Sequence, residues 1–272
     1  MTTNLTSTFT PTFLQKLLGR GYKWWYIIYY NFKLHTQYLI NEIFASTFRI
    51  SGLLTSLVIF TFLQKEDPTI ITYLVVGTAY FSTTGAQVSW FVGNSIQNGK
   101  ISRILLLPTN FFSFIFFTGF STALFLLMTY SVILIPLFII FFNSLIFSWN
   151  IGYLLMLFLI VVTIRVFIEL LVGLTAFWTT EFYGAAYLNT GMLAFFSGSV
   201  FPLNFISDKL WILNYSPYSI LFYHPMQIYL GKYSPTEILY VFLGGITWCV
   251  VLYFLAKWVF KLGLKRNESV GL

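Results

Sequence analysis

Residues 104–164 read ILLLPTNFFSFIFFTGFSTALFLLMTYSVILIPLFIIFFNSLIFSWNIGYLLMLFLIVVTI, and this stretch contains no charged residue. A helix that crosses the hydrocarbon core of a bilayer needs about 20 apolar residues. The stretch is therefore too long for a single membrane-spanning helix, and a polar break at Asn143, Ser144, Trp149 and Asn150 divides it in two. We predict a helical hairpin whose short loop lies at this break.

The whole chain has the composition of a membrane protein. Of its 272 residues, 58% are hydrophobic and 8% are charged, whereas a soluble domain carries about 25% charged residues. Aromatic residues make up 21% of the chain, and many Trp and Tyr residues lie near the ends of apolar runs, where a membrane interface would place them. These features predict an all-α, polytopic membrane protein.

The apolar runs predict about six membrane-spanning helices. A helix in lipid must pair its backbone groups internally, so each span needs an unbroken apolar run. The predicted spans are 44–63, 70–92, 110–135, 151–178, 182–201 and 237–259. Before them, residues 13–35 mix Lys and Arg with Leu, Trp and Tyr, which is typical of a basic amphipathic helix in the headgroup plane. The alternative is that this segment extends the first span into the cytoplasm.

The distribution of Lys and Arg predicts the orientation in the inner membrane. If the N-terminus is inside, most of the 15 basic residues fall on the inner side, and Lys65, Lys209 and Lys232 fall outside. This bias follows the positive-inside rule and places both termini in the cytoplasm. The predicted divisions are a cytoplasmic N-terminus with the interfacial helix (1–43), a transmembrane domain (44–263) and a cytoplasmic tail (264–272).

The residue types needed for catalysis or metal binding are scarce and scattered. The chain has two His residues, one Cys and eight acidic residues, and no pairing of nucleophile with base or cluster of metal ligands is visible. We therefore predict no catalytic site, no metal site and no cofactor bound by this chain. The net charge of +7 is attributed to the cytoplasmic side and acidic lipid headgroups, and we expect no nucleic-acid partner.

Arg165 and Glu169 are ionisable residues inside a predicted span. They are four residues apart and therefore share one face of the helix. Each, buried alone at mid-membrane, would cost about 2.5–3.5 kcal/mol on insertion scales, and pairing relieves part of that cost. Two interpretations remain open, a purely structural ion pair and a part of a polar pathway or helix contact.

A short basic segment, residues 94–108, links the second and third predicted spans. Its charged and apolar residues recur at helical spacing, which predicts a short amphipathic helix that docks on a cytosolic partner. The alternative is a basic loop that only fixes the topology. The residues expected to form this contact are Gly99, Lys100, Ile101, Arg103, Ile104, Leu105 and Pro108.

Several segments together resemble the permeases of type 2 ATP-binding-cassette exporters. They are NGKISRILLLP (98–108), AFWTTEFYG (176–184), SGSVFPLNF (197–205), and SPYSILFYHP (216–225) followed by IYLG (228–231). The resemblance is greatest to the bacterial subfamily in which two related permeases often work with one separate ATPase. The sequence departs from the family pattern at Leu107 and Ser207, where an Arg and a Pro are expected.

The resemblance implies a transporter subunit that has no ATPase site of its own. A separate nucleotide-binding subunit would hold ATP and Mg and would dock on residues 94–108, called the coupling segment below. A second permease, the same or a related chain, would complete the assembly. Residues 204–236 would form outer re-entrant helices, with an outer gate at Gly198, Pro202, Pro217 and Pro225. The alternative for this region is an ordinary extracellular loop.

The function implied is ATP-driven export of a hydrophobic or amphipathic substrate. Two hypotheses from other classes remain. One is a membrane-embedded enzyme acting on lipid, with Glu169 and Glu181 beside Arg165 as its acids. The other is a non-catalytic membrane scaffold.

Overall fold

The computed structural model describes residues 21–37, 40, 44, 68–140, 145–179, 181–200, 202–203 and 208–271. Within these ranges every regular element is a helix, which confirms the predicted all-α class. The predicted first span, 44–63, lies outside the described residues apart from Phe44. The helices are α2 (Tyr22–Gln37), α4 (Pro68–Thr83), α5 (Val88–Gln97), α6 (Ile101–Leu105), α7 (Phe111–Ile140), α8 (Ile151–Leu174), η3 (Thr175–Phe177), α9 (Tyr183–Phe196), η5 (Asp208–Tyr215), α10 (Pro217–Leu221), α11 (Tyr223–Tyr229) and α12 (Pro235–Gly271).

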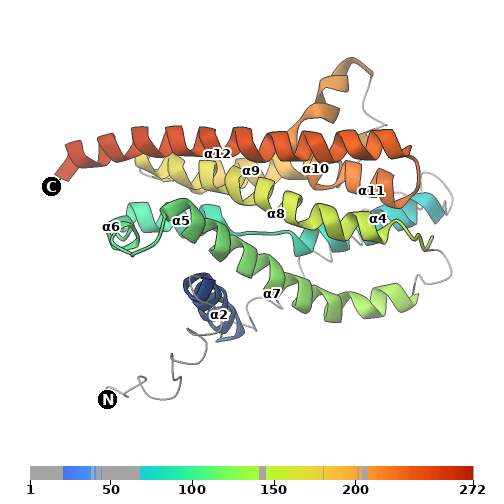
Figure 1. The fold of residues 1–272 in the computed structure, drawn as a ribbon, viewed down its shortest axis with the longest axis horizontal. Helices are drawn as coiled ribbons and strands as arrows, with labels where there is room; N and C mark the ends of the chain where they lie inside the picture. Colours follow the sequence, from blue (N-terminus) through green and yellow to red (C-terminus); the bar gives the residue numbers. More distant parts are fainter. Residues whose placement is uncertain are drawn as a thin grey trace.

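Three of the described helices are long and apolar enough to cross a membrane, namely α7, α8 with η3, and α12. α8 contacts α5, α7, α9, α10, α11 and α12, and it lies at the centre of the bundle. Figure 1 shows α7, α8 and α12 extending across the view as the longest elements. The predicted hairpin is confirmed, because α7 and α8 contact each other and residues 145–150 between them are not helical.

The predicted continuous span at 70–92 is wrong in one respect, because the helix is broken in its middle. α4 ends at Thr83 and α5 begins at Val88. Gln87, just before α5, has a φ of 49°, in the left-handed region that non-glycine residues seldom adopt. The apolar run predicted one helix because hydropathy carries no information on a backbone turn.

The predicted fifth span, 182–201, is also shorter than expected. α9 ends at Phe196, and Gly198 follows with a φ of 83°, a conformation that glycine adopts without steric cost. The backbone N–H of Tyr223 donates to the carbonyl of Ser197 at 3.0 Å. The chain therefore turns at this point and is tied to α11.

The region after this turn folds back into the bundle. α10 contacts α8, α9 and α12, and α11 contacts α8 and α4. Leu221, Phe222, Met226 and Ile228 are fully buried. Ser216 caps α10, because its side chain accepts from the backbone N–H of Ser219 at 3.3 Å, a favourable helix start.

α2 packs along α7 on the opposite side of α7 from α12 (Figure 1). It is drawn almost end-on in a view where α8 and α12 run across the page. Its contacts with successive turns of α7 join Trp24 to Phe117, Ile28 to Ser121 and Phe32 to Phe125. Four other aromatic side chains of α2 are about half exposed: Trp25, Tyr26, Tyr29 and Tyr30. A helix is thus present from Tyr22 onward, and its position in the headgroup plane remains a prediction.

α12 continues unbroken to Gly271. The predicted cytoplasmic tail, 264–272, is therefore a continuation of the last helix up to that residue. A helix of 37 residues is about 55 Å long at 1.5 Å per residue, which exceeds the thickness of the hydrocarbon core. One end of α12 must therefore extend beyond the hydrocarbon.

The close approach of α8 to α5 leads to a stability prediction. A Cβ atom added at Gly173 would lie 3.0 Å from both the backbone oxygen of Ser89 and the Cβ of Val92. Gly173→Leu should lower the free energy of unfolding by about 1–3 kcal/mol through overpacking, as measured by chemical unfolding in detergent. Gly152→Leu, on the same helix, is the matched control, because a Cβ there meets nothing within 4 Å. Equal losses for both variants would contradict the proposed close packing.

Candidate functional site in the membrane bundle

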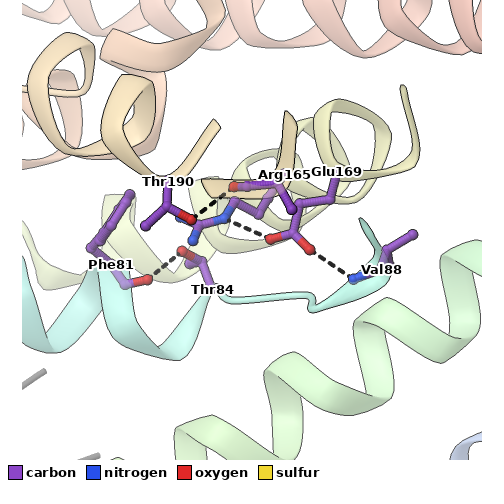
Figure 2. Close-up of polar contacts among 7 residues, drawn as sticks. Phe81, Thr84, Val88, Arg165, Glu169 and Thr190 are labelled. Atoms are coloured by element: carbon purple, nitrogen blue, oxygen red, sulfur yellow. Dashed lines mark hydrogen bonds and ion pairs between the residues drawn. The ribbon is translucent and has the colours of Figure 1, made fainter. Parts of the chain in front are cut away.

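The break between α4 and α5 lies against the charged pair of α8. Oε1 of Glu169 accepts a hydrogen bond from Nε of Arg165 at 3.2 Å. Oε2 accepts from the backbone N–H of Val88, the first residue of α5, at 2.7 Å. One buried carboxylate therefore contacts both the guanidinium and the start of the broken helix (Figure 2).

The physical role of Glu169 follows from the two positive groups that it contacts. The first turn of a helix presents unpaired N–H groups and the positive end of the helix dipole. In lipid these groups cannot be left to water, so a break in a span needs partners from the protein. Thr84 contributes as well, because its hydroxyl donates to the carbonyl of Phe81 at 2.9 Å. The pair on α8 thus stabilises a break that the sequence reading missed, although the letters TGAQ at 84–87 interrupt the apolar run.

A cavity of about 370 Å³ lies beside the ion pair, between the α4–α5 break, α8 and α9. This volume falls in the range of small-molecule sites. The guanidinium of Arg165 lies 4.5 Å from the centre of the Phe81 ring. Several polar side chains share the wall with Arg165 and Glu169: Ser82, Ser89, Asn189, Thr190 and Ser199.

Asn189 on α9 shows that this cavity has unused hydrogen-bonding capacity. The residue is 5% exposed, and its Oδ1 has no hydrogen-bond partner among the described residues. Nearly all buried polar groups in folded proteins are paired with protein or water. The cavity can therefore accommodate a polar group that donates a hydrogen bond to this oxygen.

The coupling segment forms a short helix at the end of α5. Gly99, with a φ of 67°, makes the turn between α5 and α6. Ile101 is 1% exposed and packs in the main hydrophobic core, so it anchors α6 and offers no docking surface. Leu106, which the sequence reading did not select, is 84% exposed.

Of the remaining residues of this segment, some contact the rest of the protein and others are exposed. Ile104 packs against the core, and the carbonyl of Pro108 accepts from the Lys23 ammonium at 3.4 Å. Lys100 and Arg103 are exposed. Leu105 and Leu107 are also exposed and flank Leu106. The segment thus presents leucines beside cations on its outer side.

The predicted outer-gate residues lie at the turn after α9 and in α10 and α11. Pro202 and Pro225 are buried, and Pro217 occupies the first turn of α10. The Tyr73 hydroxyl of α4 donates to the carbonyl of Gly198 at 2.8 Å. The turn is therefore tied to the second span as well as to α11.

A hydrogen-bonded group around His224, which the sequence reading did not select, lies near the outer-gate residues. Nε2 of His224 lies 2.7 Å from the carbonyl oxygen of Asn214, and Nδ1 lies 2.8 Å from the hydroxyl of Tyr233. A carbonyl can only accept, so Nε2 carries the proton, and in the neutral ring Nδ1 accepts from Tyr233. Burial lowers the pKa of His224 below its ordinary value, and the hydrogen bond to Asn214 opposes this shift.

Acidification should destabilise the protein through His224. The unfolded chain binds a proton near pH 6.5, whereas the folded ring resists protonation, so stability is lost as the pH falls below that value. The loss is at most about 1.4 kcal/mol per pH unit within this window. The difference in melting temperature between pH 7.5 and pH 5.5 should be smaller in His224→Gln than in the wild type. An unchanged pH dependence in this variant would show that another group is responsible.

A comparison with protein families identifies the bundle. A family model described as "ABC-2 family transporter protein" matches residues 66–271. The chain belongs to this family. The match covers α4 through α12, and therefore both the broken span and the coupling segment. No curated protein and no solved structure matches the chain.

This ABC-2 protein is the permease of an ABC transporter and a multi-pass membrane protein. The predicted resemblance is thereby confirmed. Permeases of this family are membrane components that generally lack an ATPase site and work with an ATP-binding partner. Among the described residues of the permease, no group of three or more His, Cys, Asp and Glu side chains could hold a metal ion.

Proposed function

We propose that the permease is an export subunit, in which ATP hydrolysis by a separate nucleotide-binding subunit drives export of a hydrophobic or amphipathic substrate. The observation that carries this proposal is the coupling segment, where Leu106 lies almost fully exposed beside Arg103. An exposed apolar surface rimmed by charge is typical of a protein-binding site. ATP and Mg would be held by the partner.

The contacts of α5 suggest how movement at this surface would reach the membrane interior. α6 is joined to α5 through Gly99 and held by the buried Ile101. The opposite end of α5 is held to α8 by the bond between Val88 and Glu169. Closure of two ATPase subunits around ATP would push α6 and α5 as a unit, shifting the permease between inward-facing and outward-facing states.

The same proposal implies an orientation of the permease in the membrane and a role for the polar cavity in transport. α6 and the C-terminal end of α12 lie at the same end of the bundle (Figure 1), and both carry basic residues, which favours a cytoplasmic position for this end in the inner membrane. The polar cavity beside Arg165 would lie on the substrate pathway. The outer turn at Gly198 would act as the outer gate.

A second permease, the same or a related chain, would cover the open side of α9. Tyr187, Leu188 and Phe195 on this helix are more than half exposed. The turn that follows α9 leaves the helical backbone pattern, and irregular backbone at membrane depth must be buried in protein or line water. A two-fold arrangement of permeases is the usual closed solution.

The experiment is purification of the permease from its native membrane in mild detergent, followed by identification of the copurifying chains and an ATPase assay. We expect a nucleotide-binding subunit whose hydrolysis is stimulated by the permease. Reconstitution of this complex into vesicles would then show ATP-dependent movement of an amphipathic dye outward. If no ATPase is found among the copurifying chains, the proposal is overturned, and a lipid-modifying enzyme or a scaffold is favoured instead.

A further inference from the structure

A second cavity, of about 440 Å³, lies between α2, α5 and α7. It shares Ala86, Gln87 and Trp90 with the cavity beside Arg165 but opens on the other side of the broken span. Among the described residues that line it, none is Asp or Glu. Its polar wall includes Asn31, His35, Asn94, Asn98, Lys100 and Thr118. The site thus combines a cation with neutral hydrogen-bonding groups.

The hydroxyl of Thr118 indicates that this cavity binds a ligand. The residue is 7% exposed, and its hydroxyl has no hydrogen-bond partner among the described residues. Its carbonyl oxygen is already used, because Thr122 donates to it at 3.1 Å. A buried hydroxyl without a partner is unfavourable, and a native structure normally supplies one.

A side-chain hydrogen bond joins α2 to α7 at this wall of the cavity. Nε2 of His35 lies 3.1 Å from Oγ1 of Thr122. The His35 ring also stacks on Phe125 with ring centres 5.0 Å apart. The wall formed by α2 is therefore held in place, and the cavity is bounded by ordered contacts.

The residues around the cavity are typical of a membrane surface. α2 exposes four aromatic residues, Trp25, Tyr26, Tyr29 and Tyr30, the residue types that gather at headgroup level. Lys23 and Lys33 on the same helix are exposed, and basic residues there attract anionic lipid. Phe91 lines the cavity and is itself partly exposed, so an apolar side chain lies at the cavity wall and at the protein surface.

We propose that this cavity binds the phosphate headgroup of an anionic membrane phospholipid. Both Lys100 and Thr118 line the cavity. The Lys100 ammonium would supply the positive charge for the phosphate, and the Thr118 hydroxyl would donate to an oxygen elsewhere in the headgroup. Charged hydrogen bonds of this kind are stronger than neutral ones. The bound headgroup would bridge α2 to the coupling segment. This binding goes beyond the transport function and does not depend on the direction of transport.

The test is native mass spectrometry of the delipidated permease titrated with phosphatidylglycerol or with zwitterionic phosphatidylcholine. We expect a tightly retained phosphatidylglycerol, an affinity about tenfold lower in Lys100→Gln and about fivefold lower in Thr118→Val. Lys33→Gln is the matched control, because Lys33 is an exposed cation of α2 outside the cavity wall. Its affinity should equal that of the wild type.

Melting without lipid separates binding from folding. Thr118→Val removes a hydroxyl that lacks a partner, so its melting temperature should equal or exceed that of the wild type, while its stabilisation by phosphatidylglycerol falls. Equal binding of the two lipids, or unchanged affinity in both cavity variants, would overturn the proposal. Displacement of the lipid by excess inorganic phosphate would assign the site to free phosphate instead. A missing ATPase partner would leave these measurements unaffected.

Discussion

Replacing Glu169 with alanine should lower the free energy of unfolding by about 3–5 kcal/mol, the usual cost of removing one partner of a buried ion pair. The variant removes the carboxylate that faces the Arg165 guanidinium and the acceptor for the Val88 N–H at the start of α5. Both losses occur at a side chain that is largely buried, since Glu169 is 6% exposed. Chemical unfolding in detergent would measure the change.

A double-mutant cycle identifies the source of this effect. Glu169→Gln keeps an acceptor for Val88 but removes the charge, so its cost should be smaller than that of alanine. Arg165→Met combined with Glu169→Leu leaves no charge unpaired, and it should be less destabilising than the sum of the two single variants by at least about 1 kcal/mol. Strict additivity would show that the two side chains do not stabilise each other.

Replacing Leu106 with aspartate should weaken binding of the nucleotide-binding subunit by about 30-fold or more, without unfolding the permease. Leu106 is 84% exposed, so the substitution removes no contact of the core. Loss of a central apolar contact in an interface commonly costs 2 kcal/mol or more, which corresponds to this factor. Affinity measured by surface binding of the purified ATPase would test it.

Two further variants make the result specific. Ile212→Asp is the matched control, because Ile212 is 64% exposed in η5, which belongs to the predicted outer region. Its ATPase affinity should be unchanged. Ile101→Ala should act differently again, by lowering the stability of the permease through loss of a core side chain. If Leu106→Asp binds the ATPase with the affinity of the wild type, the coupling segment is not part of the interface.

Only the charged residues of the candidate site could be identified from the sequence. Arg165 and Glu169 stand out because ionisable residues are rare in apolar spans and their spacing of four places them on one helical face. Val88 and Asn189 could not be found in this way. Val88 acts through a backbone N–H that every non-proline residue carries, and Asn189 becomes notable only when α9 packs beside the break.

The coupling segment shows the same division. Its position, basic charge and helical spacing were visible in residues 98–108, and the helix α6 lies there. Spacing could not determine which side of so short a helix faces the bundle. The structure places Ile101 inside and Leu106 outside, because the turn at Gly99 sets the direction in which α6 leaves α5.

The sequence by itself determined that this chain is an all-α membrane protein with a hairpin at 104–164 and an ABC-2 family pattern. Those conclusions rest on hydropathy, charge and local motifs, which act within one helix at a time. Only the tertiary structure decided that the second span is broken, that Glu169 caps its second half, α5, and that two polar cavities meet at the break. These features arise from contacts between helices distant in the chain, and a one-dimensional pattern does not contain the geometry of those contacts.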